Sequence, residues 1–224
     1  MKNFNIKIAD HIFNINSDNE EIFNMCKDYI VEDGNPVELI SIENEDNIGK
    51  AFSLMYQKIA DYLIKENSLI IHGASIEYKN KGYIFIGPSG TGKSTHINYW
   101  INHLKDLIVI NGDKPIVKVG ENNSTIYGSP WCGKERLGTN TNCILDSIVI
   151  LKRGSINRIL EVSPKEHIED IINEIYIPGN NLLNIVDLLN KLFKTCRLYV
   201  MECLDNEEAF YVAYKELTGE NCEG

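Results

Sequence analysis

The sequence predicts an α/β fold, in which one mixed β-sheet is flanked by helices. An apolar strand, a glycine-rich loop and a helical pattern follow one another over residues 83–103. Runs rich in β-branched and aromatic residues flank turn-forming residues before and after this segment. Towards the C-terminus, apolar runs of strand length alternate with amphipathic helical patterns, and this alternation is typical of α/β proteins.

The N-terminal third shows short alternating runs followed by one helical pattern. Apolar positions between Ala51 and Leu63 recur at helical spacing, which predicts a helix that ends near Lys65. The chain has 224 residues, which is enough for one sizeable core, and no linker interrupts it. We therefore expect residues 1–65 to be integrated with a core of residues 66–224 in a single compact domain. The expected elements are strands at 4–8, 12–15 and 37–42, a weak helix at 20–29 and a helix at 48–65.

The middle of the chain predicts a hairpin and a well-defined helix. The residues Lys79-Asn80-Lys81-Gly82 form a turn between the β-rich runs 69–78 and 83–86. The helix that follows should cover residues 93–103, with Ile97, Trp100, Ile101 and Leu104 facing inward. The later elements are expected as strands at 107–110, 116–119, 124–127, 147–151 and 198–203, and as helices at 165–175, 181–193 and 206–217.

Composition narrows the classes of partner. The formal net charge of −10 argues against a nucleic-acid surface, which normally needs a basic stripe. The longest apolar runs, such as residues 148–151, have the length of strands, so no membrane partner is expected. No apolar segment of signal-peptide type follows Lys2, and no Cys-x-x-Cys pair occurs among the 6 cysteines. These features predict a cytoplasmic protein with free thiols, and a homo-oligomer stays an open alternative.

The segment Gly87-Pro88-Ser89-Gly90-Thr91-Gly92-Lys93-Ser94 meets the pattern G-x-x-x-x-G-K-[ST] in full. It follows an apolar strand and opens a helix, which is the context that a P-loop requires. Glycines let backbone N–H groups point inward at phosphate oxygens, and the helix adds its positive dipole end. We therefore expect residues 87–95, through Thr95, to bind ATP, with Lys93 at the β- and γ-phosphates and Ser94 as a ligand of Mg²⁺.

An acidic residue follows the next buried strand. The apolar run 107–110 ends at Asn111-Gly112-Asp113, which is the Walker B arrangement. Asp113 would then hold Mg²⁺ directly or through water. The alternative is that Asp113 only begins a turn with Gly112 and the Lys114-Pro115 pair that follows.

In this order, His72-Gly73-Ala74-Ser75, the P-loop and Asn111-Gly112-Asp113 resemble the HPr kinase/phosphorylases. The segment Tyr127-Gly128-Ser129-Pro130-Trp131-Cys132-Gly133-Lys134 is similar to a stretch of the shorter bacterial HPr-kinase-like proteins. The resemblance is strongest over residues 69–140. It implies the P-loop fold shared by the catalytic domain of HPr kinase and by phosphoenolpyruvate carboxykinase.

The resemblance implies an ATP- and Mg²⁺-dependent kinase that transfers the γ-phosphoryl group to a hydroxyl. The acceptor would be a serine of a protein or peptide, or a small molecule. His72 matches the family's histidine beside the catalytic aspartate, whereas it could also be a buried imidazole bonded to the backbone. Gly112 occupies a position where the family usually shows a second acid. Two alternatives therefore stay open, a non-catalytic ATP-binding regulatory protein and a small-molecule enzyme of the carboxykinase type.

The residues Pro130 to Lys134 form a turn-rich loop that carries an aromatic side chain and a cation. Lys134, with Arg136 nearby, could neutralise charge on the transferring phosphoryl group, and Trp131 could support the loop. The alternative is a solvated lysine beside a half-buried tryptophan. The catalytic set predicted here is thus Asp113, His72, Lys93 and Lys134, while a bystander role is expected for Cys132, and a packing or surface role for His96.

Overall fold

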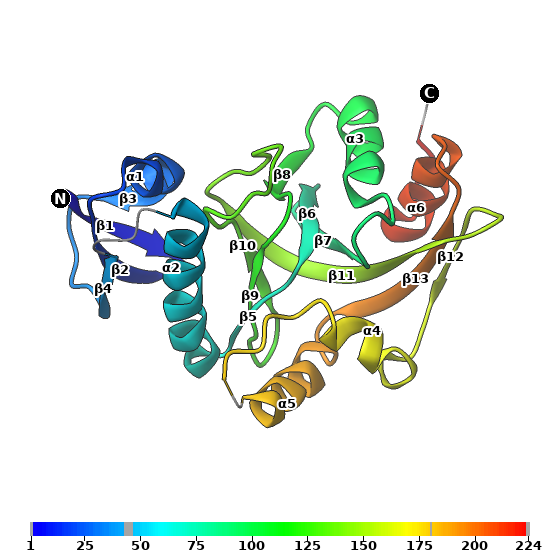
Figure 1. The fold of residues 1–224 in the computed structure, drawn as a ribbon. Coiled ribbons are helices and arrows are strands. Elements are labelled where there is room, and N and C mark those ends of the chain that lie inside the picture. The colour runs from blue at the N-terminus through cyan, green and yellow to red at the C-terminus, as the bar shows by residue number, and fades with distance from the viewer. Residues whose placement is uncertain (1, 43–46, 180, 223–224) are drawn as a thin grey trace.

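Two mixed β-sheets with flanking helices organise the chain in a computed structural model, which describes residues 2–42, 47–179 and 181–222. A four-stranded sheet with the strand order β3-β1-β2-β4 lies near the N-terminus. A nine-stranded sheet follows it and carries most of the remaining helices (Figure 1). The α/β class with mixed sheets is therefore confirmed, whereas the expectation of one sheet is wrong, because within these ranges the strands near the N-terminus pair only with one another.

The N-terminal sheet forms because alternating residues in its strands share one apolar face. Ile6 and Ile8 of β1 and Phe13 and Ile15 of β2 are all buried on this face. The helix α2 covers the same face through Met55 and Ile59. The elements of this part are β1 Lys2–Ile8, β2 His11–Ser17, α1 Glu20–Cys26, η1 Lys27–Tyr29, β3 Ile30–Val31, β4 Glu38–Ile42, α2 Ile48–Leu63 and η2 Ile64–Glu66.

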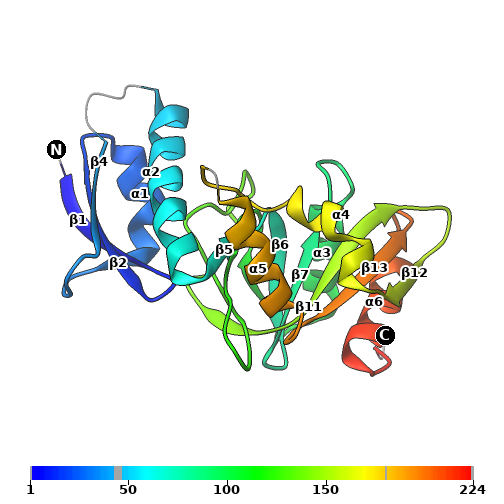
Figure 2. The same ribbon diagram turned by 90° about the horizontal axis from the view of Figure 1, so that it is seen from below.

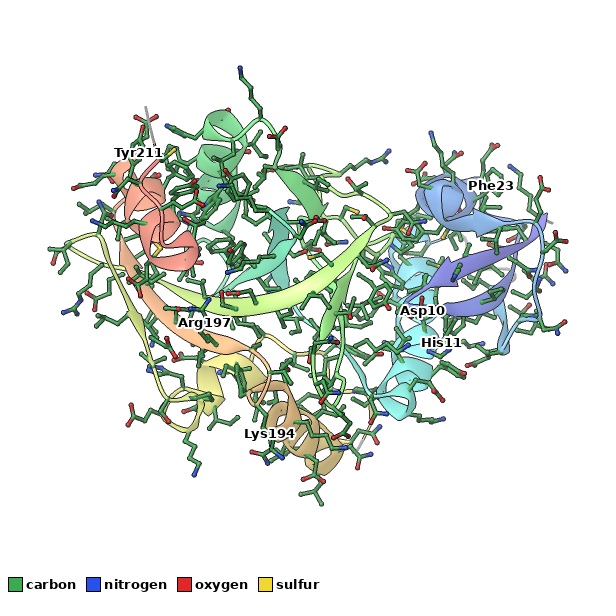
Figure 3. The ribbon with its side chains drawn as sticks, turned by 180° about the vertical axis from the view of Figure 1, so that it is seen from behind. Asp10, His11, Phe23, Lys194, Arg197 and Tyr211 are labelled. Carbon is green, nitrogen blue, oxygen red and sulfur yellow. The ribbon has the colours of Figure 1, made fainter. Side chains whose placement is uncertain are left out.

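The N-terminal part packs against the rest of the chain through shared apolar and polar contacts. Its core cluster also includes Ile70, Ile116 and Trp131. Asp10, in the turn between β1 and β2 (Figure 3), accepts hydrogen bonds from the Tyr127 hydroxyl at 2.6 Å and from Lys118 Nζ at 3.1 Å. The bond from Tyr127 and the Lys118 charge lower the pKa of Asp10. That the two parts form one compact domain stays a prediction.

The large sheet is built around one long strand, β11. Its first half pairs antiparallel with β10, whereas its second half pairs parallel with both β7 and β13. The sheet therefore runs β5-β9-β10-β11-β7-β6-β8, with β13 and β12 added at β11. The strands are β5 Ser68–Ile70, β6 Gly73–Tyr78, β7 Lys81–Ile86, β8 Ile108–Asn111, β9 Ile116–Lys118, β10 Thr125–Tyr127, β11 Asn142–Arg153, β12 Arg158–Glu161 and β13 Arg197–Cys203.

Helices cover both faces of the β7–β11–β13 region (Figure 2). Tyr83 and Phe85 point to the face of α3 and α6, while Ile84 and Ile86 point to the face of α4 and α5. This alternation follows from the two-residue period of a strand. The helical segments here are α3 Lys93–His103, η3 Pro164–Glu166, α4 Ile168–Ile172, α5 Leu182–Leu192 and α6 Glu208–Thr218.

Several expectations need correction. The run 69–78 is two strands, because β5 pairs with β9 while β6 pairs with β7 and β8, so the chain breaks at Ile71 and His72. Ile101 does not face inward and is 38% exposed, whereas Ile97 and Trp100 are buried. The helix expected at 165–175 is reduced to η3 and α4, and β12 was not expected. No helix in the described ranges has the length and apolar character needed to cross a membrane.

Candidate functional site

The candidate site lies at one edge of the large sheet, where strand direction brings distant segments together. β7 is parallel to β11, and β6 is antiparallel to both β7 and β8. The carboxyl ends of β7, β8 and β11 therefore meet at the amino end of β6. This edge carries His72 before β6, Gly87 after β7, Gly112 after β8 and Arg153 at the end of β11.

The P-loop has a backbone that requires its glycines. Gly87, Gly90 and Gly92 have φ values of +146°, +83° and +100°, a region that side chains with a Cβ rarely adopt. A Cβ at Gly87 would lie 2.7 Å from the carbonyl oxygen of Leu151. At Gly90 and Gly92 no atom lies within 4 Å of the Cβ position, so the loop faces open space there. This geometry fits a phosphate cradle.

Lys93 begins α3 and turns back over the loop. Its Nζ donates to the carbonyl oxygen of Gly87 at 2.5 Å. Burial lowers the pKa of Lys93, although the negative charges of Glu174 and Asp113 act in the opposite direction. No side chain caps the N-terminus of α3, whose N-cap residue is Gly92. The lysine and the helix dipole are thus directed at the same side of the loop.

Asp113 belongs to a chain of charged side chains. Its Oδ1 lies 3.5 Å from His72 Nε2, and its Oδ2 accepts a hydrogen bond from Lys114 Nζ at 2.6 Å. On the other side of the imidazole, His72 Nδ1 lies 2.6 Å from Glu174 Oε2. The two nitrogens of the imidazole thus face two different acids, Nδ1 facing Glu174 and Nε2 facing Asp113. The ring is thereby held in one orientation.

Asn111 fixes the turn that carries Asp113. This buried side chain accepts hydrogen bonds from the backbone N–H groups of Asp113 at 2.8 Å and Lys114 at 2.6 Å. Its Nδ2 donates to the carbonyl and hydroxyl oxygens of Ser129, both at 3.0 Å. The turn after β8 is consequently tied to residues 128–138, which we call the Trp131 loop.

Gly112 packs closely beneath the Trp131 loop. Its N–H donates to the carbonyl oxygen of Leu137 at 2.8 Å. A Cβ at this position would lie 3.1 Å from that oxygen and 3.3 Å from the carbonyl oxygen of Cys132. A Cβ at residue 112 would therefore require these two carbonyl oxygens to shift slightly, whereas glycine lets the Trp131 loop pack closely here.

A cleft of about 870 Å³ unites these elements. Asp113 and Lys134 line it together with the whole loop from Ser89 to Thr95. Arg153 also lines it and donates from Nη2 to the carbonyl oxygen of Gly90 at 2.5 Å. The predicted residues Asp113, His72, Lys93 and Lys134 thus line one cleft, and Pro88, whose carbonyl oxygen accepts from the Thr91 hydroxyl, shapes the loop behind it.

Metal binding would depend on few protein ligands. The Ser94 hydroxyl and the Asp113 carboxylate line the same cleft, and oxygen donors suit Mg²⁺. Within the described ranges, no group of 3 or more His, Cys, Asp or Glu side chains could hold a metal ion. The donor set fits Mg²⁺, which usually keeps waters and binds through one or two protein ligands together with phosphate oxygens.

Two further residues that the sequence singled out also line this cleft, but their contacts are those of packing residues. His96 is 3% exposed and packs between Phe85 and Trp100, in agreement with a packing role. Cys132 donates from Sγ to the carbonyl oxygen of Ser129 at 3.1 Å. Burial raises the pKa of its thiol to about 11, which disfavours the nucleophilic thiolate.

Sequence reasoning missed Glu174 and Arg153. Glu174 lies 102 residues from its partner His72 and has no motif around it, so only the topology could reveal it. Arg153 had a readable signal, because it lies two residues after the apolar strand predicted at 147–151. Arginine there is well placed to bind an anion or a loop carbonyl.

Comparison with known proteins adds no family to this geometry. No protein-family model matches the chain, and no curated protein matches its sequence at a significant level.

Proposed function

We propose that this protein is an ATP- and Mg²⁺-dependent phosphotransferase that phosphorylates a hydroxyl group. One observation carries the proposal, namely that Lys93, Asp113 and Lys134 line a single cleft with the P-loop, while His72 lies 3.5 Å from Asp113. The HPr-kinase-like P-loop fold is part of this proposal. The sheet-edge arrangement of P-loop and acid supports it, as does the order of the motifs along the chain.

Each residue has a distinct role in the proposed reaction. The backbone N–H groups of the P-loop and Lys93 bind the phosphates, and Ser94 with Asp113 would hold Mg²⁺. Bound Mg²⁺ supplies charge neutralisation at the phosphate oxygens. The Asp113 carboxylate orients the acceptor hydroxyl and takes its proton, while His72 positions that carboxylate. Lys134 also lines the cleft and would stabilise the negative charge that develops during transfer.

Thermal unfolding tests nucleotide binding. At a concentration of ATP and Mg²⁺ about 100 times Kd, binding stabilises the folded state by about 2.7 kcal/mol and raises Tm. Lys93→Ala should remove most of this shift, whereas Lys105→Ala, on an exposed lysine outside the cleft, should retain it. A folded wild type without an ATP-dependent shift would refute the proposal.

Transfer itself is tested with γ-labelled ATP and candidate hydroxyl acceptors. Asp113→Asn keeps the shape of the side chain but removes its charge, so it should retain some nucleotide affinity and lose Mg²⁺ dependence and phosphoryl transfer. Turnover of Asp113→Asn at the wild-type rate would withdraw the catalytic role of Asp113. Nucleotide binding without transfer to any acceptor would instead favour the regulatory ATP-binding protein.

A further inference from the structure

A second cleft, of about 910 Å³, opens on the other side of the Trp131 loop. One wall comes from α1, η1 and α2 of the N-terminal part, and the other from residues 130–140. Asp113, Cys132, Gly133 and Lys134 line both this cleft and the P-loop cleft. The two clefts therefore meet at Asp113. In the proposed function, its carboxylate takes the proton of the acceptor.

Gly133 makes this junction narrow. Its φ is +75°, and a Cβ there would lie 3.1 Å from the Cβ of Asp113. The backbone of the Trp131 loop consequently lies directly against the Asp113 side chain. Only a thin layer of the protein therefore separates the two clefts. A hydroxyl that enters from the second cleft can reach Asp113 while the P-loop holds the phosphates on the other side.

Part of the lining of the second cleft is aromatic. Trp131 packs edge-to-face on Tyr56, with ring centroids 5.0 Å apart, and Tyr56 packs on Tyr176 at 4.7 Å. Tyr29 and Phe52 also line the cleft. A pocket of roughly 300–1,000 Å³ that combines aromatic side chains with polar groups can hold a small molecule.

The charges of the cleft favour an anionic ligand. Lys27, Lys114, Lys134 and Arg136 line it, against Glu21, Asp28 and Asp113, although acids outnumber bases by 32 to 22 in the whole chain. Lys114 forms an ion pair with Asp113, with 2.6 Å between Nζ and Oδ2. In the parts of the chain that the structure describes, Lys27, Lys134 and Arg136 are exposed and take part in no ion pair. Their charges are thus available to a ligand, and they exceed by one those of Glu21 and Asp28, which also take part in no ion pair that the structure describes.

We infer that the second cleft is the acceptor site and takes a small hydroxyl compound that carries an acidic group and an apolar part. This inference rests on the proposed function. The acceptor oxygen forms a bond to the γ-phosphorus of ATP, and the bond from that phosphorus to the β,γ-bridging oxygen breaks, leaving its electron pair on ADP. The hydroxyl proton passes to the Asp113 carboxylate. Lys27 and Arg136 bind the acidic group, and the aromatic lining binds the apolar part.

Calorimetric binding of 3-phenyllactate, which has a hydroxyl, a carboxylate and a ring, tests the inference without ATP. We expect saturable binding, and binding at least about tenfold weaker for 3-phenylpropane-1,2-diol, which lacks the carboxylate. Lys27→Glu should weaken binding of the acid by a similar factor. Lys50→Glu makes the same charge change on α2 outside the cleft and should leave it unchanged. With γ-labelled ATP, phenyllactate should accept label and 3-phenylpropanoate, which lacks the hydroxyl, should not.

The outcomes separate the two proposals. Equal binding of acid and diol would overturn the assignment to anionic acceptors, and no saturable binding of either would overturn the acceptor site itself. Label found on a serine peptide, without binding of phenyllactate, would assign the acceptor to peptides instead. Selective binding of phenyllactate with no ATP-dependent rise in Tm would retain the cleft as an anion site and refute the kinase.

Discussion

His96 provides a quantitative test of how α3 is packed. Its Nε2 accepts a hydrogen bond from Trp100 Nε1 at 3.0 Å, so the neutral ring carries its proton on Nδ1, which has no partner in the structure. Burial lowers the pKa of His96 from 6.5 to about 4. Protonation at Nε2 would also set two donors against each other. The folded state therefore favours the neutral imidazole.

The sign and size of the pH effect follow from linkage. Because the pKa in the folded state lies below that in the unfolded state, the unfolded chain binds more protons between pH 6.5 and 4. The contribution of His96 to stability is thus present above pH 6.5 and is lost as the pH falls towards 4. Between pH 7 and pH 5 the loss is about 2 kcal/mol.

Urea unfolding of wild type and His96→Gln at pH 7 and pH 5 isolates this term. Glutamine can still accept the hydrogen bond from Trp100 but does not titrate. Because it packs less well than the buried ring, the variant should be less stable at pH 7, by about 1–2 kcal/mol. The variant should gain about 2 kcal/mol relative to wild type at pH 5. Asn98→Gln, on an exposed position of the same helix, should follow the wild-type pH dependence. A constant difference between wild type and His96→Gln at both pH values would refute the reasoning.

The remaining predictions concern the site. Lys134→Ala should keep ATP affinity within about threefold but lower phosphoryl transfer by roughly 10²-fold, because it removes one electrostatic stabiliser. An equal loss of ATP affinity and of transfer, measured beside the control Lys105→Ala, would instead indicate that Lys134 contacts the bound nucleotide. Glu174→Gln keeps a partner for His72 but removes the charge, so transfer should fall at least about tenfold while the ATP-dependent Tm shift persists. Gly112→Asp should lower both transfer and the free energy of unfolding, the latter by about 1–3 kcal/mol in urea titrations; higher transfer would show that a second acid is accommodated.

The sequence was most informative where a local pattern has one structural solution. The P-loop motif predicted both the loop and the helix over residues 93–103, because lysine, glycines and helix start occupy consecutive positions. Asn111-Gly112-Asp113 was predicted at a strand end for the same reason. Local patterns could not reveal that Asn111 bonds to Ser129 across 18 residues, or that Glu174 reaches His72. These contacts depend on the order of the strands in the sheet, and no local pattern in the sequence indicates that order.

The N-terminal part shows the same limit. Its strands and α2 were readable from alternation and helical spacing, since each buries one face. Their position beside the Trp131 loop could not be predicted from the sequence, because it depends on a few contacts such as that of Asp10 with Tyr127. The second cleft exists only through this packing, so no inspection of residues 20–56 alone could have linked Lys27 or Tyr56 to Asp113.

The register of the long strand β11 determines both the packing of the core and the position of Arg153 at the site. Ile148 and Ile150 face α4 and α5, Val149 and Leu151 face α3 and α6, and the same strand ends in Arg153 on the P-loop. A slip of one residue would exchange the two apolar faces and at the same time withdraw the guanidinium from Gly90. Pairing errors in this strand would thus be penalised twice, once in packing and once in loop geometry. The correct register of the sheet is thereby also what places Arg153 against the loop of residues 87–94.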